Sequence, residues 1–157
     1  MADRRFSSAV PMSRGGKKRE YPDHPVVGVG AVVLREGRVL LVKRGVEPRR
    51  GLWAVPGGTL RLGETLSEGA ERETYEETGV RVKAGEVIYV FDLIEKDEEG
   101  RSRFHFVVVD LEAEYVDGEA KGADDALEAR WVSPEECLLL PMSANTVKLL
   151  RARGFLP

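Results

Sequence analysis

One segment of this chain carries clear signals for where a helix starts and stops, and it lies among segments patterned as strands. Thr65 with Glu68 three residues later matches a capping box, and Gly79 supplies the left-handed conformation that commonly ends a helix. These signals predict a helix over residues 66–78. Because most other apolar runs are short and bounded by turn residues, the sequence predicts an α+β fold with a mixed sheet.

The strand pattern opens with a hairpin over residues 26–44, whose two apolar runs flank Glu36 and Gly37. Pro134 marks the first position of a short helix, and residues 144–153 form a last helix. We therefore expect a single domain over residues 26–157. The remaining strands are predicted at residues 53–55, 59–62, 87–94, 104–111 and 129–132, with a charged loop at 95–103.

Composition excludes several classes of protein. The chain has 157 residues, with 24 Lys and Arg against 27 Asp and Glu, which is typical of one globular domain. No run approaches the roughly 18 apolar residues of a membrane span, and no N-terminal apolar core indicates secretion, so we expect a cytoplasmic protein. One cysteine and 2 histidines cannot supply a disulfide framework or an ordinary zinc site.

The predicted helix carries an acidic face where an apolar stripe would be usual. Glu73, Glu76 and Glu77 stand at i, i+3 and i+4, which places three carboxylates on one face. Like charges at this spacing destabilise a helix unless a cation neutralises them, and oxygen ligands without imidazole or thiolate favour Mg²⁺ or Mn²⁺. Arg72 precedes Glu76 by four residues and can brace the carboxylates. Taken alone, the same face could be a solvated acidic surface.

The residues around the helix favour the metal site. Their spacing resembles the Nudix box, in which a glycine is followed by Glu after five residues, by Arg-Glu after seven more, and then by Glu-Glu and Gly. The matching residues are Gly58, Glu64, Arg72, Glu73, Glu76, Glu77, Gly79 and Val80. Thr74 departs from the aliphatic residue that the family favours, although its methyl group can still pack. Pro56-Gly57 and residues 128–133 resemble the Nudix flanks, so the resemblance covers residues 26–150.

The resemblance implies the Nudix α/β/α sandwich, with a loop, a helix and a loop beside a mixed sheet. It implies hydrolysis of a pyrophosphate in a nucleoside diphosphate linked to another group, with ADP-ribose as the first candidate substrate. The alternatives are a nucleoside triphosphate, including an oxidised one, the 5′ end of an RNA, and a module that binds nucleotide or RNA without catalysis. By the same resemblance, Mg²⁺ or Mn²⁺ is held by Glu73, Glu76, Glu77 and the carbonyl of Gly58, with Arg72 and Glu64 orienting these ligands.

The general base is left open between a box glutamate and an acid of a later loop. Asp125 and Glu128, shortly before Trp131, are the best candidates in that loop, and Asp124 and the acids at 95–99 are others. Arg44, and the pair Arg49 and Arg50, could bind phosphate through their guanidinium groups. Trp53 and Phe91 could stack on a base, although both lie in strand patterns where core packing is the commoner role.

Residues 1–25 differ from the rest, because six basic residues precede residue 20 and prolines and glycines interrupt any period. We interpret them as a basic arm outside the domain. Such a charge run is usually a solvated tail, and the alternatives are binding to nucleic acid or to the second subunit of a homodimer. Since the arm precedes the whole box, we expect deletion of residues 1–20 to leave hydrolysis of a small nucleotide nearly unchanged.

Overall fold

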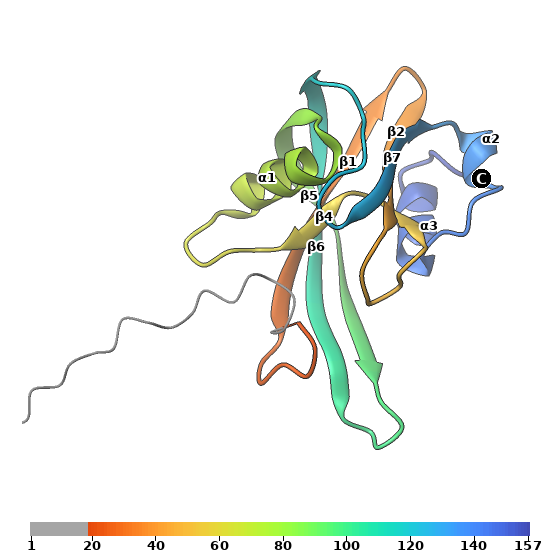
Figure 1. Cartoon of the computed structure of the whole chain (residues 1–157). Helices are drawn as coiled ribbons and strands as arrows, with labels where there is room; N and C mark the ends of the chain where they lie inside the picture. Colours follow the sequence, from red (N-terminus) through yellow and green to blue (C-terminus); the bar gives the residue numbers. More distant parts are fainter. Residues whose placement is uncertain (1–18) are drawn as a thin grey trace, which may run out of the picture.

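The computed structural model describes residues 19–157, so most of the expected basic arm lies outside the described residues. A mixed seven-stranded sheet, counted over the described part, forms the centre of the molecule (Figure 1). The main strand order is β3-β2-β1-β6-β5, with β4 paired to β1 and β7 paired to β2. The elements are β1 Val26–Arg35, β2 Arg38–Arg44, β3 Trp53–Ala54, β4 Gly57–Thr59, α1 Leu66–Thr78, β5 Arg81–Lys96, β6 Ser102–Asp117, β7 Ala126–Val132, α2 Pro134–Cys137 and α3 Ala144–Ala152.

Helices cover both faces of the strands, which confirms the expected α+β class and the layered arrangement (Figure 1). On one side, Ala70 of α1 packs on Val29, Ala31 and Val33, alternate residues of β1. On the other side, Leu149 and Leu150 of α3 pack in a second core with residues of β1 and β2. The parallel pairing of β1 with β6 joins the strands on the β2 side of the sheet to the β5–β6 hairpin.

The predicted helix is confirmed from its first residue to its last. The Thr65 side chain accepts a hydrogen bond from the Glu68 N–H, the Glu68 side chain accepts one from the Thr65 N–H, and Gly79 has φ 74°. Thr74, the departure from the family pattern, is fully buried, and its hydroxyl donates to the Ala70 carbonyl over 2.7 Å. The methyl group of Thr74 therefore packs while its hydroxyl is satisfied within the helix.

Three strands have bounds that differ from the predicted ones. The strand expected at residues 59–62 lies at Gly57–Thr59 instead, pairing with β1. A Cβ at Gly57 would come within 2.3 Å of the Val29 carbonyl oxygen, so this strand needs residues without side chains, and side-chain alternation cannot reveal it. β5 and β6 have 16 residues each, longer than the eight expected, because register shifts in β5 break the alternation.

The described end of the arm is packed against the β5–β6 hairpin. The Tyr21 N–H donates to the Arg103 carbonyl over 2.7 Å, and the Tyr21 hydroxyl donates to Asp97 over 3.0 Å. Glu20 accepts from Arg103 over 2.8 Å. Residues 19–21 are therefore held on the domain, in contrast to the expected solvated arm. Across residues 19–157, no helix is long and apolar enough to cross a bilayer.

Candidate active site

Arg72 lies at the centre of the acidic face of α1. Its guanidinium donates two hydrogen bonds to Glu64, over 2.6 and 2.9 Å, and one to the Thr59 carbonyl over 3.1 Å. The same group donates to Glu73 over 2.6 Å and to Glu76 over 3.1 Å. One cation thus orients three carboxylates and ties the helix to the strand and loop that precede it, as expected for Arg72 and Glu64.

Glu77 lies one turn beyond Glu73 on the side of α1 that meets the sheet, and both side chains are buried. The Gly57 N–H donates to Glu77 Oε2 over 3.3 Å. Burial, and then the charge of Glu73, raise the pKa of Glu77 to about 8. Burial also raises the pKa of Glu73, against the opposing effect of Arg72. The Glu77 carboxyl therefore lacks the neighbouring positive charge that would hold it ionised at neutral pH.

The donor chemistry of this face fits a divalent cation of the Mg²⁺ type. A Cβ at Gly58 would lie 2.4 Å from Glu73 Oε2, so the glycine lets this carboxylate reach the backbone. Glu73, Glu76 and Glu77 offer oxygen atoms only. As they stand, no three acidic, imidazole or thiol groups among residues 19–157 converge on one point, since Arg72 lies between Glu73 and Glu76.

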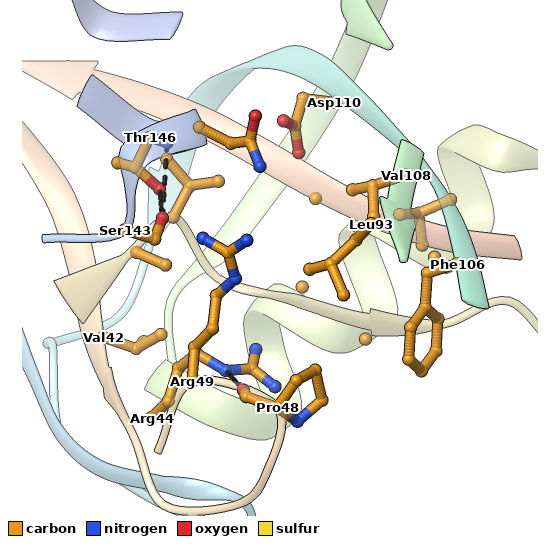
Figure 2. Close-up of a pocket in the computed structure, with 18 of the residues that line it drawn as sticks. Val42, Arg44, Pro48, Arg49, Leu93, Phe106, Val108, Asp110, Ser143 and Thr146 are labelled. Carbon is orange, nitrogen blue, oxygen red and sulfur yellow. Dashed lines mark hydrogen bonds between the residues drawn. The ribbon is translucent and has the colours of Figure 1, made fainter. Parts of the chain in front are cut away.

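A cavity of about 120 Å³ adjoins the buried end of this face. Glu77 and Gly58 line it on one side, and the N-terminal end of α3 lines it on another. Figure 2 shows Arg44 and Arg49 on one side of the cavity, facing an apolar wall from β5 and β6. That wall consists of Phe91, Leu93, Phe106 and Val108. The cavity thus joins carboxylates, cations and an apolar surface in one space, the combination that a nucleotide requires.

The cations of the cavity are only partly neutralised. Arg44 donates to the Pro48 carbonyl over 2.8 Å, and burial lowers its pKa although Glu77 favours its charge. Arg49 lies 3.8 Å from Glu95, too far for a hydrogen bond. In the described part of the chain, three buried side-chain atoms lack a hydrogen-bond partner, and all three belong to residues that line this cavity. They are Nε of Arg19, Nε of Arg49 and Oγ1 of Thr59.

Comparison with known proteins places this geometry in a family. Residues 24–152 match the model of the NUDIX domain. The chain belongs to the Nudix family. It is 33% identical to an ADP-ribose pyrophosphatase of Methanocaldococcus jannaschii, over 82% of this chain and 73% of that protein. This Nudix chain is therefore a pyrophosphohydrolase.

Solved Nudix structures share its fold. A MutT NUDIX hydrolase from Burkholderia pseudomallei matches with a TM-score of 0.70 and 29% identity, over 82% of this chain and 98% of that one. A bifunctional NMN adenylyltransferase/ADP ribose pyrophosphatase from Francisella tularensis, complexed with AMP and a Mn ion, matches with a TM-score of 0.61 and 25% identity. That match covers 83% of this chain and 42% of the bifunctional protein.

The two later-loop acids of this Nudix domain lie in different places. Asp125 lines the cavity, because the loop that carries it is tied to the end of α1 by the Ala123 N–H, which donates to the Glu77 carbonyl over 3.0 Å. Glu128 lies beyond that tie on β7, where it is exposed and pairs with Lys43 of β2 at 4.0 Å. The structure thus brings Asp125, and not Glu128, to the cavity lining, since Glu128 lies opposite Lys43 in the β2–β7 pair.

Two of the predicted substrate residues are placed outside the cavity. Trp53 is 2% exposed and packs in the core under α3, with the Arg130 guanidinium 4.5 Å from its ring, so it offers no face to a base. Arg50 is exposed, whereas its neighbour Arg49 lines the cavity. The turn explains why Arg49 and not Arg50 lines the cavity, because Arg49 has φ 65° and the two neighbouring side chains point in different directions. Phe91 and Arg44, the other two candidates, line the cavity.

The structure adds Asp110, which the sequence reasoning missed. Asp110 lies on β6, is 3% exposed, and lines the cavity at the labelled position in Figure 2. Burial raises its pKa to about 7. A Cβ at the neighbouring Gly30 would lie 2.3 Å from Asp110 Oδ1, so the glycine makes room for the carboxyl group. The sequence signal that could have indicated Asp110 is its position as a single acid in an otherwise apolar run, since burial of an acid costs free energy.

Proposed function

We propose that this enzyme hydrolyses the pyrophosphate bond of ADP-ribose, releasing AMP and ribose 5-phosphate. The observation that carries the proposal is the continuity of one cavity from Glu77 to Arg44, Arg49 and the apolar wall of β5 and β6. A pyrophosphate with a group attached at each end needs neighbouring acidic, basic and apolar surfaces. The named activity of the relative from Methanocaldococcus jannaschii supports the choice of ADP-ribose.

Mg²⁺ or Mn²⁺ is the proposed cofactor, held by Glu73, Glu76, Glu77 and the carbonyl of Gly58. When bound, such an ion neutralises charge at the phosphates and lowers the pKa of a water molecule. Arg72, through its two hydrogen bonds to Glu64, would hold the helix in place beside such an ion. Arg44 and Arg49 hold phosphate oxygens and align the phosphorus for attack by water.

Asp125 is the proposed general base, which takes the proton of the attacking water at a carboxylate oxygen. It is the later-loop acid that combines a place in the cavity with closeness to Glu77, whose pKa its charge raises. Replacement of Asp125 by Asn should lower kcat about 100-fold, the usual contribution of general base catalysis. Glu128→Gln is the matched control and should keep kcat within about twofold. A normal kcat for Asp125→Asn would instead assign the base to a box glutamate.

The substrate is tested by a panel of nucleotides with Mg²⁺. The panel contains ADP-ribose, ordinary and oxidised nucleoside triphosphates, and a short RNA with a 5′-triphosphate, with products separated by ion-exchange chromatography. We expect the highest kcat/KM for ADP-ribose, with AMP as a product. A higher kcat/KM for a triphosphate would contradict the choice of ADP-ribose, and nucleotide binding without any turnover would favour a non-catalytic module.

A homodimer is proposed as the oligomeric state. β5 stands at the end of the strand order, so its outer edge is open in the described chain, and Val90 and Ile94 of this strand are exposed. Open strand edges with apolar side chains favour association. Light scattering after size exclusion measures the mass directly, and a monomeric mass at micromolar concentration would contradict the proposal.

A further inference from the structure

Arg19 precedes the matched domain, yet its side chain lies at the active-site cavity. The NUDIX match begins at residue 24. The Arg19 side chain is only 18% exposed, lines the cavity, and places Nη2 at 3.6 Å from Asp125 Oδ2. Its positive charge favours the ionised form of Glu73 and disfavours the ionised form of Arg44. Arg19 therefore interacts electrostatically with both groups. A segment outside the family motif thus contributes a cation to the site.

The segment that carries Arg19 is fixed by its own contacts. Tyr21 is bound at both its N–H and its hydroxyl, to Arg103 and Asp97 of the β5–β6 hairpin. The Arg101 guanidinium also lies 5.1 Å from the centre of the Tyr21 ring. These contacts are two residues from Arg19, which limits the positions that its side chain can reach. We call residues 19–21 the strap.

The charges in the cavity indicate what Arg19 binds. Arg19, Arg44 and Arg49 line one space and repel one another, and two of the three leave a buried Nε without a hydrogen-bond partner among residues 19–157. Buried donors of this kind cost free energy unless a ligand satisfies them. A pyrophosphate supplies several anionic oxygen atoms, and guanidinium groups bind such oxygens with paired hydrogen bonds.

We propose that Arg19 is a substrate-binding residue, delivered by the strap, that contacts the phosphate oxygens of the pyrophosphate. This inference rests on the proposed function, because it assumes a pyrophosphate substrate in the same cavity. It changes the expectation for the arm, since deletion of residues 1–20 would remove Arg19 and weaken substrate binding. The contact to Asp125 then holds the guanidinium in place before the substrate arrives.

The first test compares Arg19→Ala and Arg19→Lys with wild type in steady-state kinetics. Arg19→Ala should raise KM about tenfold, the effect of one lost hydrogen bond to a charged group, with a smaller change in kcat. Arg19→Lys should recover part of the loss, since it restores the charge without the paired geometry. Arg153→Ala is the matched control, an arginine that pairs with Glu112 away from the cavity. An unchanged KM for Arg19→Ala would overturn the inference.

The second test separates binding from turnover. ADP-ribose binding is titrated calorimetrically in the presence of Mg²⁺, with Glu77→Gln and with the double variant Glu77→Gln/Arg19→Ala. The double variant should bind about tenfold more weakly, whether or not ADP-ribose is the best substrate. Equal affinities would overturn the role of Arg19 and leave the proposed function standing, whereas absence of turnover by wild type would overturn the function alone.

A third variant addresses the strap. Tyr21→Phe removes the hydroxyl contact to Asp97 and leaves the ring. It should raise KM about twofold to threefold, and should add nothing to Arg19→Ala in the double variant, because both act through one guanidinium. Full additivity of the two effects would contradict delivery of Arg19 by the strap. A changed pH profile of kcat with unchanged KM in Arg19→Ala would show action through Asp125, and would also overturn the inference.

Discussion

The two walls of the active-site cavity are built in opposite ways. The acidic wall comes from one continuous stretch, residues 57–77, in which a helix sets the distances between carboxylates. We call the rest of the cavity lining the facing wall; it is assembled from separate segments, with cations at Arg19, Arg44 and Arg49, an acid at Asp110 and the apolar residues of β5 and β6. A site of the first kind can be read from spacing along the chain. A site of the second kind exists only once the sheet has formed.

The walls also differ in charge. On the acidic wall, three carboxylates accept hydrogen bonds from the single cation Arg72, and Glu77 is a fourth acid bound to the Gly57 N–H, while three arginines line the facing wall. Each wall alone carries an excess of one sign of charge, and burial of unbalanced charge costs free energy. The proposed divalent cation and anionic substrate, bound together, would balance the charge of both walls. The predictions below change one wall at a time.

The largest effect is expected on the acidic wall. Glu73→Gln and Glu77→Gln should each lower kcat at least about 100-fold, because a carboxamide is a poor ligand for Mg²⁺. The fold should persist, since burial already favours the neutral form of both carboxyls. Initial rates at saturating Mg²⁺ and thermal unfolding measure the two properties. Wild-type rates in both variants would contradict the assignment of the metal ligands.

Metal removal tests the same wall without a mutation. EDTA should abolish turnover, and excess Mg²⁺ should restore it. Mg²⁺ should also raise the thermal midpoint of wild type, because a ligand of the folded state adds RT ln(1 + [L]/Kd) to its stability. The variant Glu77→Gln should show a smaller shift. An equal shift in both proteins would place the stabilising ion elsewhere.

A smaller loss is expected on the facing wall. Arg44→Ala should lower kcat/KM about tenfold to 100-fold, since hydrogen bonds to charged groups contribute about 1.5–3 kcal/mol. Arg50→Ala is the matched control, because Arg50 is exposed and does not line the cavity. Steady-state kinetics with one substrate decide the comparison. Equal losses in the two variants would mean that general surface charge, and not this wall, attracts the substrate.

The pH dependence of metal binding should be about tenfold between pH 7 and pH 9. The pKa of Glu77 is about 8 without metal, so the carboxyl is mostly protonated at pH 7 and mostly ionised at pH 9. A metal ion must displace this proton, and its apparent affinity should therefore rise with pH. Activity at limiting Mg²⁺ should rise in parallel toward pH 8.5–9. An activity maximum near pH 5 would contradict this order of events.

The sequence was informative wherever neighbours along the chain determine the outcome. The capping residues Thr65 and Glu68 and the stop at Gly79 depend on contacts within one helix, and all three were predicted. Arg49 and Arg50 are adjacent and chemically alike, so the sequence could not show which of them faces the cavity. Their placement depends on the left-handed φ of Arg49 within a turn.

Side-chain pattern failed where tertiary contacts decide the outcome. Trp53 and Phe91 lie in similar strand patterns, yet one packs under α3 and the other lines the cavity. Alternation of side chains assigns residues to the two faces of a strand, but it does not show which elements pack on each face. The position of β4 was predicted wrongly for a related reason, since Gly57 is required by the neighbouring backbone of β1 and Gly58 by the side chain of Glu73, and glycines give no alternating pattern.

The last effect concerns Asp110, and it is measured as stability. Burial raises the pKa of Asp110 to about 7, whereas an unfolded Asp has a pKa near 3.9. The folded state therefore keeps a proton that the unfolded state has lost between these values, so this group destabilises the fold increasingly as pH rises from about 4 to 7, and by a constant amount above. The substitution Asp110→Asn should remove this pH-dependent loss of stability. The variant should match wild type near pH 4 and be more stable by about 4 kcal/mol at pH 8, since a pKa difference of one corresponds to about 1.4 kcal/mol.

Urea unfolding in EDTA at pH 5 and pH 8 measures this difference. Glu73 and Glu77 contribute a pH dependence of the same sign, because burial raises their pKa values too. The decisive quantity is thus the change in the gap between Asp110→Asn and wild type from pH 5 to pH 8. A gap that stays constant would mean that Asp110 is already ionised in the folded state. A gap that grows with pH would mean that the facing wall holds a neutral carboxyl at low pH and carries its three cations with little opposing charge.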